Sequence, residues 1–248
     1  MIVVNEQRDA QRNRQRVSVL IPLLFVVILW LIQLLQWGTN SDFGVLGIFP
    51  RSFSGLTGIL FSPLIHGGWD HLVSNTIPLL VLGFLMIYFY RNVAYRVVLL
   101  IWLMDGIGVW LIGRDAYHIG ASGIVYGMAS FLFFSGILRK SRELLALSLA
   151  VVFIYGSMIW GMFPYVLKVS WEAHLVGFLS GIFFAVYYRQ KGPPDDVLPE
   201  WMNEAEGESE GENGSGNENS SNEQVKKINI NYIFTPKNPS DGSKAPDK

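Results

Sequence analysis

Six apolar stretches place the strongest constraint on how this chain can fold. A helix needs roughly 20 mainly apolar residues to cross the hydrocarbon core of a bilayer, and six segments reach or approach that length. They are residues 17–37, 71–90, 95–112, 122–138, 144–163 and 171–188. Only 16% of the 248 residues are charged, which is less than in an ordinary soluble domain. The sequence therefore predicts an all-α membrane protein with six transmembrane helices.

The two ends of the chain differ from this apolar middle. Residues 1–16 form a basic N-terminal arm, and no small-residue cleavage site follows the first apolar run, so residues 17–37 are expected to stay as a membrane helix. The membrane domain is expected to cover residues 17–190. Residues 191–248 are rich in Glu, Asn, Gly and Ser, a composition that cannot bury a core. We expect a disordered cytoplasmic tail, in which the alternating "ININ" at 228–231 is the one piece that could dock onto a partner.

The distribution of positive charge predicts the orientation of the helices, because cytoplasmic loops carry an excess of Lys and Arg. With a cytoplasmic N-terminus, eleven such residues fall inside and three outside. The inner ones are Arg8, Arg12, Arg14, Arg16, Arg91, Arg96, Arg139, Lys140, Arg142, Arg189 and Lys191, and the outer ones are Arg51, Arg114 and Lys168. We expect a multi-pass protein of the cell membrane with both termini in the cytoplasm and the long loop 38–70 at the outer interface.

Few strongly polar residues lie within the apolar stretches, and such residues are functional candidates because they are costly in a membrane. They are His71, Asn75, Asp105, Ser122 and His174. His71 and Asn75 are four residues apart and share a helix face, as do Ser122 and Tyr126. All except Asp105 fall near the expected outer ends of their helices, so they can share one layer.

Two glycine patterns predict which helices meet. Gly123 and Gly127 form a G-x-x-x-G face on one segment, and Gly177 and Gly181 form another beside His174. Such faces let membrane helices approach closely, which would bring the Ser122 hydroxyl to the imidazole. Each feature alone most often reflects ordinary packing. Their combination at one depth indicates chemistry instead.

Three motifs occur in order: "HGGWDHLVSN" (66–75), "GASGIVYG" (120–127) and "AHLVGFLSG" (173–181). They resemble the H-x4-H-x3-N, G-x-S-G and A-H-x2-G-x3-G patterns of the rhomboid family of intramembrane serine proteases, over about residues 55–190. The resemblance implies a six-helix rhomboid-like bundle that hydrolyses peptide bonds within or near the membrane. Its substrates would be transmembrane segments of other proteins.

The resemblance also implies roles for single residues. Ser122 corresponds to the nucleophile and His174 to the general base, while His71 and Asn75 correspond to side chains of the oxyanion hole. Tyr126 matches the ring that packs on the catalytic imidazole.

Further positions correspond to residues that shape the site. Gly120 and Gly123 match the glycines that frame the nucleophile, and His66 matches a loop histidine above the site. Many bacterial rhomboids have a Trp-Arg pair in the first loop, where this chain has Thr57 and Gly58. This departure concerns the conformation of the loop rather than the chemistry.

No carboxylate is evident to orient the imidazole. Glu172 should point away from the His174 face, and Asp105 lies too deep, where it is expected to hydrogen-bond a neighbouring helix. We therefore expect a Ser–His dyad in which Tyr126 stacks on the ring, with no cofactor, no metal and no nucleic-acid partner. Cysteine is absent, so a thiolate metal site is excluded. The alternatives are a non-catalytic rhomboid-like protein that escorts membrane clients and a small proton-relaying transporter.

Overall fold

The computed structural model describes residues 2–139, 141–165 and 169–191. Within these ranges the regular elements are helices, and the β-type pairing is an isolated bridge between Ile48 and His118. The predicted tail, including its "ININ" piece, lies outside the described residues apart from Lys191.

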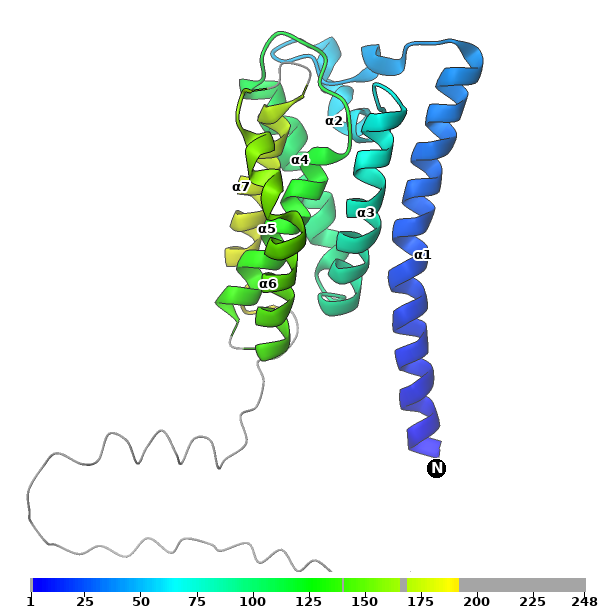
Figure 1. Cartoon of the computed structure of the whole chain (residues 1–248), viewed down its shortest axis with the longest axis vertical. Coiled ribbons are helices and arrows are strands. Elements are labelled where there is room, and N and C mark those ends of the chain that lie inside the picture. The colour runs from blue at the N-terminus through cyan, green and yellow to red at the C-terminus, as the bar shows by residue number, and fades with distance from the viewer. Residues whose placement is uncertain (1, 140, 166–168, 192–248) are drawn as a thin grey trace, which may run out of the picture. The chain divides into compact units, whose positions relative to one another are not determined.

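All six expected helices are present in the structure (Figure 1). They are α1 (Ile2–Thr39), α3 (Trp69–Phe89), α4 (Ala94–Ile112), α5 (Ser122–Leu138), α6 (Arg142–Tyr155) and α7 (Trp171–Tyr187). Among the residues that the structure describes, four stretches are long and apolar enough to cross a membrane: Gln11–Thr39, Trp69–Phe89, Ala94–Ile112 and Arg142–Met162. The apolar helices α5 and α7 have 17 residues each. Because α1 begins at Ile2, the basic arm and the first apolar segment form one continuous helix.

The fifth apolar segment departs from a simple helix. We expected residues 144–163 to be helical throughout, but α6 ends at Tyr155 and continues as the 3₁₀-helix η4 (Gly156–Met162). A 3₁₀-helix is tighter and has poorer hydrogen-bond geometry than an α-helix, so a run of seven residues is unusual. The carbonyl groups of two η4 residues accept hydrogen bonds from side chains of other helices, as described below.

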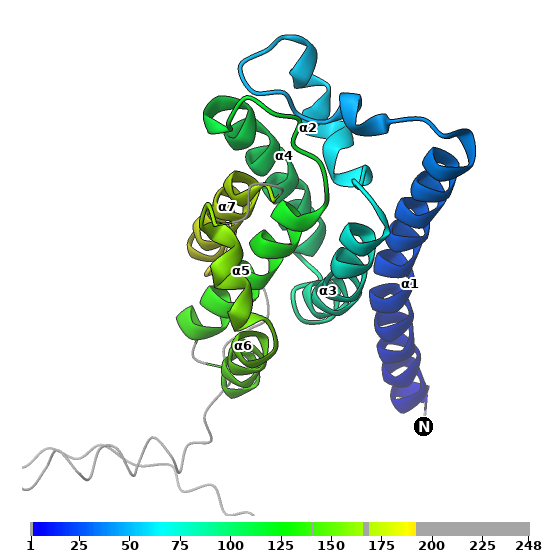
Figure 2. The same cartoon turned by 45° about the horizontal axis from the view of Figure 1, so that its top comes forward.

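The segment between α1 and α3 folds into short helical turns: η1 (Phe43–Leu46), η2 (Ser54–Leu56), α2 (Gly58–Phe61) and η3 (Ser62–Leu64). It crosses the end of the bundle opposite the start of α1 (Figures 1 and 2). Two indole N–H groups of α4 hold it in place, because Trp102 donates to the Ile59 carbonyl at 2.9 Å and Trp110 to the Ser52 carbonyl at 2.8 Å.

The absence of an arginine at position 58 has a direct steric cause. A β-carbon at Gly58 would overlap the backbone of Gly47, because the two chain segments touch there. No side chain of any kind fits at this position, whereas Thr57 beside it is exposed. The loop is therefore built around backbone contact at this position.

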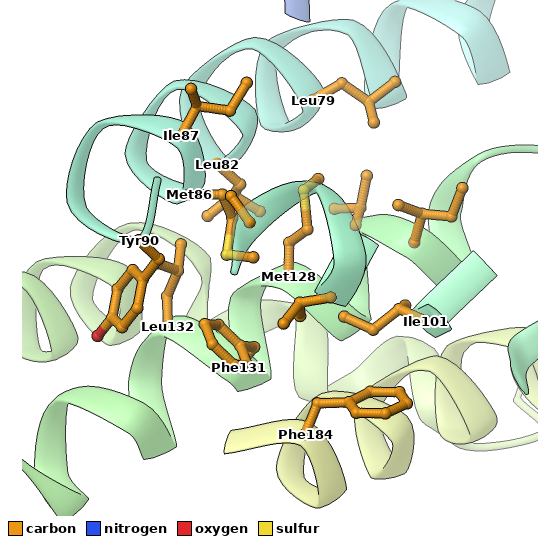
Figure 3. Close-up of a cluster of buried hydrophobic side chains, with 14 of the residues drawn as sticks. Leu79, Leu82, Met86, Ile87, Tyr90, Ile101, Met128, Phe131, Leu132 and Phe184 are labelled. Atoms are coloured by element: carbon orange, nitrogen blue, oxygen red, sulfur yellow. The ribbon is translucent and has the colours of Figure 1, made fainter. Parts of the chain in front are cut away.

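The buried core takes side chains from α1, α3, α4, α5, α6 and α7, and Figure 3 shows its part between α3, α4, α5 and α7. Leu82 and Met86 of α3 meet Phe131 and Leu132 of α5, and Phe184 of α7 closes the cluster from the other side. Lipid tails are as apolar as these side chains, so close packing rather than escape from water holds membrane helices together.

Helices α5 and α7 make the closest crossing, and glycines allow it. β-Carbons at Gly177 and Gly181 would overlap the carbonyl oxygens of Gly123 and Gly127, respectively. The predicted approach of these two helices is therefore present. The α5 glycines have a second role that was not predicted, because they face α4: a β-carbon at Gly127 would overlap Ile101.

We expect Gly177→Leu to lower the stability of the protein by roughly 3 kcal/mol, because overpacking a close contact forces the backbones apart. Gly38→Leu in α1 is the matched control, since no atom outside the backbone of its own helix lies within 4 Å of a β-carbon added there. Thermal unfolding in detergent measures both. An unfolding midpoint of the Gly177 variant equal to that of the control would contradict the close crossing.

Candidate active site

Ser122 is the first residue of α5, and the backbone before it explains its position. Gly120 has a φ of +111°, a conformation that favours glycine. Its N–H donates to the Ser62 carbonyl at 2.8 Å, and a β-carbon there would lie 2.6 Å from Cε1 of His71. Gly120 is thus required both by its backbone and by its neighbour. The turn leaves the Ser122 side chain at the N-terminus of the helix, where the first N–H groups have no partner within the helix.

His174 lies in the first turns of α7 and faces Ser122. Its Nε2 is 2.8 Å from the Ser122 hydroxyl oxygen, within hydrogen-bond distance. Its Nδ1 is 2.8 Å from the carbonyl oxygen of Gly161 on η4. The imidazole is buried, while Ser122 is half-buried. The structure therefore brings together the two side chains that the sequence paired.

Tyr126 covers one face of this imidazole. The two rings are stacked, with centroids 4.1 Å apart and an angle of 10° between their planes. The tyrosine hydroxyl donates to the Met158 carbonyl at 2.6 Å, so its ring is fixed to η4 as well as to α5. The spacing of four residues from Ser122 places both side chains on one face of α5, as predicted.

His71 and Asn75 lie across from the serine on α3. One N–H of the Asn75 amide donates to the His71 carbonyl at 2.9 Å, and an amide group has a second N–H to offer. The His71 ring packs against Gly120 and meets the ring of His66 edge-on, with centroids 5.0 Å apart. Burial and the nearby His71 lower the pKa of His66 to about 3, so His66 is neutral at pH 7.

These residues face one cavity of about 960 Å³. Ser122, His174, Tyr126, His71 and Asn75 all line it, and its other walls combine polar residues such as Ser170 with apolar ones such as Ile154. Volumes of roughly 300–1,000 Å³ are typical of sites that bind small molecules and cofactors. The cavity gives the Ser122 hydroxyl room for a reacting group beside it.

The two nearby acids do not bind the imidazole. The carboxylate of buried Glu172 accepts a hydrogen bond from the Arg114 backbone N–H at 3.3 Å and lies 3.6 Å from its guanidinium. The buried Asp105 side chain packs against Gly123 of α5. Glu172 thus points away from His174 toward Arg114, as the sequence indicated, and the hydrogen bond expected of Asp105 stays a prediction. Across the described residues, no group of three or more His, Asp or Glu residues could hold a metal ion.

Two features of the site were missed from the sequence. Gly161 contacts His174 through its backbone, which gives no side-chain signal. Ser170 caps α7 by accepting from the Ala173 N–H at 3.4 Å and lies 2.6 Å from Nδ1 of His118. The serine just before an apolar helix is a capping signal that could have been found.

Comparison with known proteins shows the family of the chain. The chain matches the Rhomboid domain over residues 54–191. Proteins of Mycobacterium tuberculosis (strain ATCC 25618 / H37Rv) and Mycobacterium bovis are each 38% identical over 172 residues, which cover 66% of this chain and 72% of the relative. A Mycobacterium leprae protein is 34% identical over 190 residues, covering 73% and 75%. All three are named as uncharacterized proteins, so none brings an activity to this chain.

The lowered pKa of His66 predicts acid sensitivity. The unfolded chain binds a proton at this residue below pH 6.5, whereas the folded protein resists it down to about pH 3. Its contribution to stability is therefore present above pH 6.5 and is lost as the pH falls through this window, by about 1.4 kcal/mol per pH unit at most. His66→Phe keeps a ring against His71 and should flatten this pH dependence. An equally steep loss between pH 7 and pH 5 in thermal unfolding of both proteins would contradict it.

Proposed function

Because the chain belongs to the rhomboid family, we propose that it is an intramembrane serine endopeptidase that cleaves transmembrane segments of other membrane proteins. Ser122 is the nucleophile and His174 the general base. The observation that carries the proposal is the distance of 2.8 Å between the Ser122 hydroxyl oxygen and His174 Nε2, inside a cavity that leaves room for a peptide bond.

The chemistry follows from this pair. A serine hydroxyl is a weak nucleophile until a positioned base takes its proton. His174 Nε2 accepts the Ser122 proton while the serine oxygen bonds to the carbonyl carbon, whose oxygen becomes an oxyanion. When the tetrahedral intermediate collapses, the C–N bond breaks and the leaving amine takes the proton from Nε2. Water then attacks the acyl-serine in the same manner, which releases a carboxylate and restores Ser122.

The oxyanion has three candidate donors on two helices. The Ser122 backbone N–H stands at the N-terminus of α5, where the helix dipole favours negative charge. The second N–H of the Asn75 amide and the His71 ring face the same cavity from α3. Removing a single donor of this kind typically lowers the rate by about 10²–10³-fold.

A substrate that lies in the membrane must meet both water and the dyad before its peptide bond can be hydrolysed. In this proposal α1, α3, α4, α5, the α6–η4 unit and α7 are the six spans, and the positive charge places both termini in the cytoplasm. The dyad then opens toward the outer face, where water reaches it through the cavity. A transmembrane substrate must unwind locally to expose a peptide bond, which Gly or Pro near the cut would assist.

Covalent labelling tests the assignment of the nucleophile. We expect a fluorophosphonate probe to label the purified wild-type protein, and we expect Ser122→Ala and His174→Ala each to remove the labelling. The serine variant removes the bond-forming atom, and the histidine variant removes the base that activates it.

Both variants should keep the circular dichroism and unfolding midpoint of the wild type, which excludes misfolding as the cause. Labelling that persists in Ser122→Ala would overturn the nucleophile. Labelling that persists in His174→Ala would assign the base to another residue. A wild-type protein that is folded but never labelled would favour the non-catalytic, client-binding alternative.

The orientation has its own test, which the lack of native cysteines makes simple. Ser41→Cys lies on an exposed residue of the α1–α2 connection, and Asn92→Cys on an exposed residue between α3 and α4. In intact cells we expect a membrane-impermeant maleimide to label the Ser41→Cys variant alone, and to label both variants after the membrane is opened. The reverse pattern would place the active site toward the cytoplasm.

A further inference from the structure

We propose that the backbone carbonyl of Gly161 positions His174, in the role that a carboxylate has in a catalytic triad. This inference rests on the proposed function, since it names a further residue of the same site. Gly161 does not touch the reacting atoms. It acts through the imidazole, from an element of the fold that lies outside both helices of the dyad.

The hydrogen-bond pattern fixes the tautomer. A carbonyl oxygen only accepts hydrogen bonds, so the contact of 2.8 Å between Nδ1 and the Gly161 oxygen requires a proton on Nδ1. A neutral imidazole then has no proton on Nε2. That nitrogen is the one 2.8 Å from the Ser122 hydroxyl, and its lone pair accepts the serine proton. The opposite tautomer would present an N–H to Ser122 and could not act as its base.

The same contact also favours the charged intermediate. When Nε2 takes the serine proton, the ring becomes an imidazolium with a proton on each nitrogen. The Nδ1–H bond to Gly161 then becomes a charge-assisted hydrogen bond, which is stronger than the neutral one. Glu172 pairs with Arg114, and Asp105 packs against Gly123. The Gly161 carbonyl is the acceptor that the structure gives to Nδ1.

Steric contacts explain why a glycine holds this place. A β-carbon at position 161 would overlap the Tyr126 hydroxyl and lie 3.1 Å from Nδ1 of His174. The Tyr126 hydroxyl binds the Met158 carbonyl three residues earlier. Two carbonyl groups of η4 therefore fix the two stacked rings, one at the phenol and one at the imidazole. In this arrangement the 3₁₀ segment at the end of α6 positions the rings of Tyr126 and His174.

Nitrogen NMR tests the tautomer directly, without any substrate. The full chain is labelled with ¹⁵N-histidine and placed in lipid nanodiscs at pH 8. It has four histidines, and the His174 signals are those missing from His174→Ala. We expect the proton of His174 on Nδ1. A proton on Nε2, or an even mixture of tautomers, would overturn the proposal whether or not the protein is a protease.

Substitution of Gly161 tests the consequence for chemistry. We expect Gly161→Ala to slow fluorophosphonate labelling of Ser122 by roughly 100-fold, the effect of misplacing a catalytic group by about 1 Å. The loss should fall on the maximal labelling rate rather than on the probe concentration for half-maximal rate. Gly156→Ala is the matched control in the same segment, because its β-carbon would lie 3.6 Å from the nearest side chain.

A second change separates positioning from simple damage. Tyr126→Phe removes the hydroxyl that the alanine would overlap, so the double variant Tyr126→Phe/Gly161→Ala should label at least about tenfold faster than Gly161→Ala alone, a difference of about 1.4 kcal/mol in activation free energy. The NMR signals of the double variant should show Nδ1–H again. No recovery in rate or tautomer, or a Gly161→Ala variant as fast as Gly156→Ala, would count against Gly161 as a positioning residue. If the wild type is never labelled, the proposed protease fails while the NMR result still decides the tautomer.

Discussion

Contact between the backbones of α5 and α7 is the interaction on which the rest of the site depends. Ser122 has a short side chain, so its hydroxyl meets an imidazole on another helix only if the two helices nearly touch. Gly177 lies against the Gly123 carbonyl and Gly181 against that of Gly127, so no β-carbon separates the two backbones at these points. Since lipid offers no hydrophobic force to bring helices together, this contact must be stabilised by dispersion and by bonds such as that from Ser130 to the Phe178 carbonyl at 2.8 Å.

A second constraint is that polar backbone and side-chain groups need hydrogen-bond partners when the surroundings are apolar. Unsatisfied backbone groups are costly at membrane depth, and irregular chain is tolerated only where it is covered by protein or lines a wet cavity. The chain before Ser122 meets this condition by binding Ser62 through Gly120 and Ile48 through His118. The 3₁₀ turn η4 meets it by directing two carbonyl groups to Tyr126 and His174. Each irregular segment is therefore also a part of the site.

The sequence predicted most of the features that depend on regular helices, namely their positions and the residues that share a face. Apolar length located the six helices, and the spacing of four residues placed Tyr126 beside Ser122. Matched glycine pairs correctly predicted that α5 and α7 cross closely. What it could not predict arises where backbone rather than side chains makes the contact. The sequence around Gly161 does not indicate that its carbonyl contacts His174, thirteen positions later. The distance between the carbonyl oxygen and the imidazole depends on how the chain between them folds. The change from α6 to η4 was missed for the same reason, because apolarity alone does not distinguish two helix types.

Under the proposed function, the shortness of α5 limits how deep in the membrane the Ser122 hydroxyl would lie. Seventeen residues rise about 25 Å, whereas the hydrocarbon layer is about 30 Å thick. If α5 stood upright with Leu138 at one boundary of this layer, Ser122 would lie roughly 5 Å inside the other boundary. One helical turn adds about 5.4 Å. A helix longer by one turn would therefore place the hydroxyl at the lipid headgroups rather than within the hydrocarbon layer. The number of residues in α5 therefore determines the depth of the Ser122 hydroxyl.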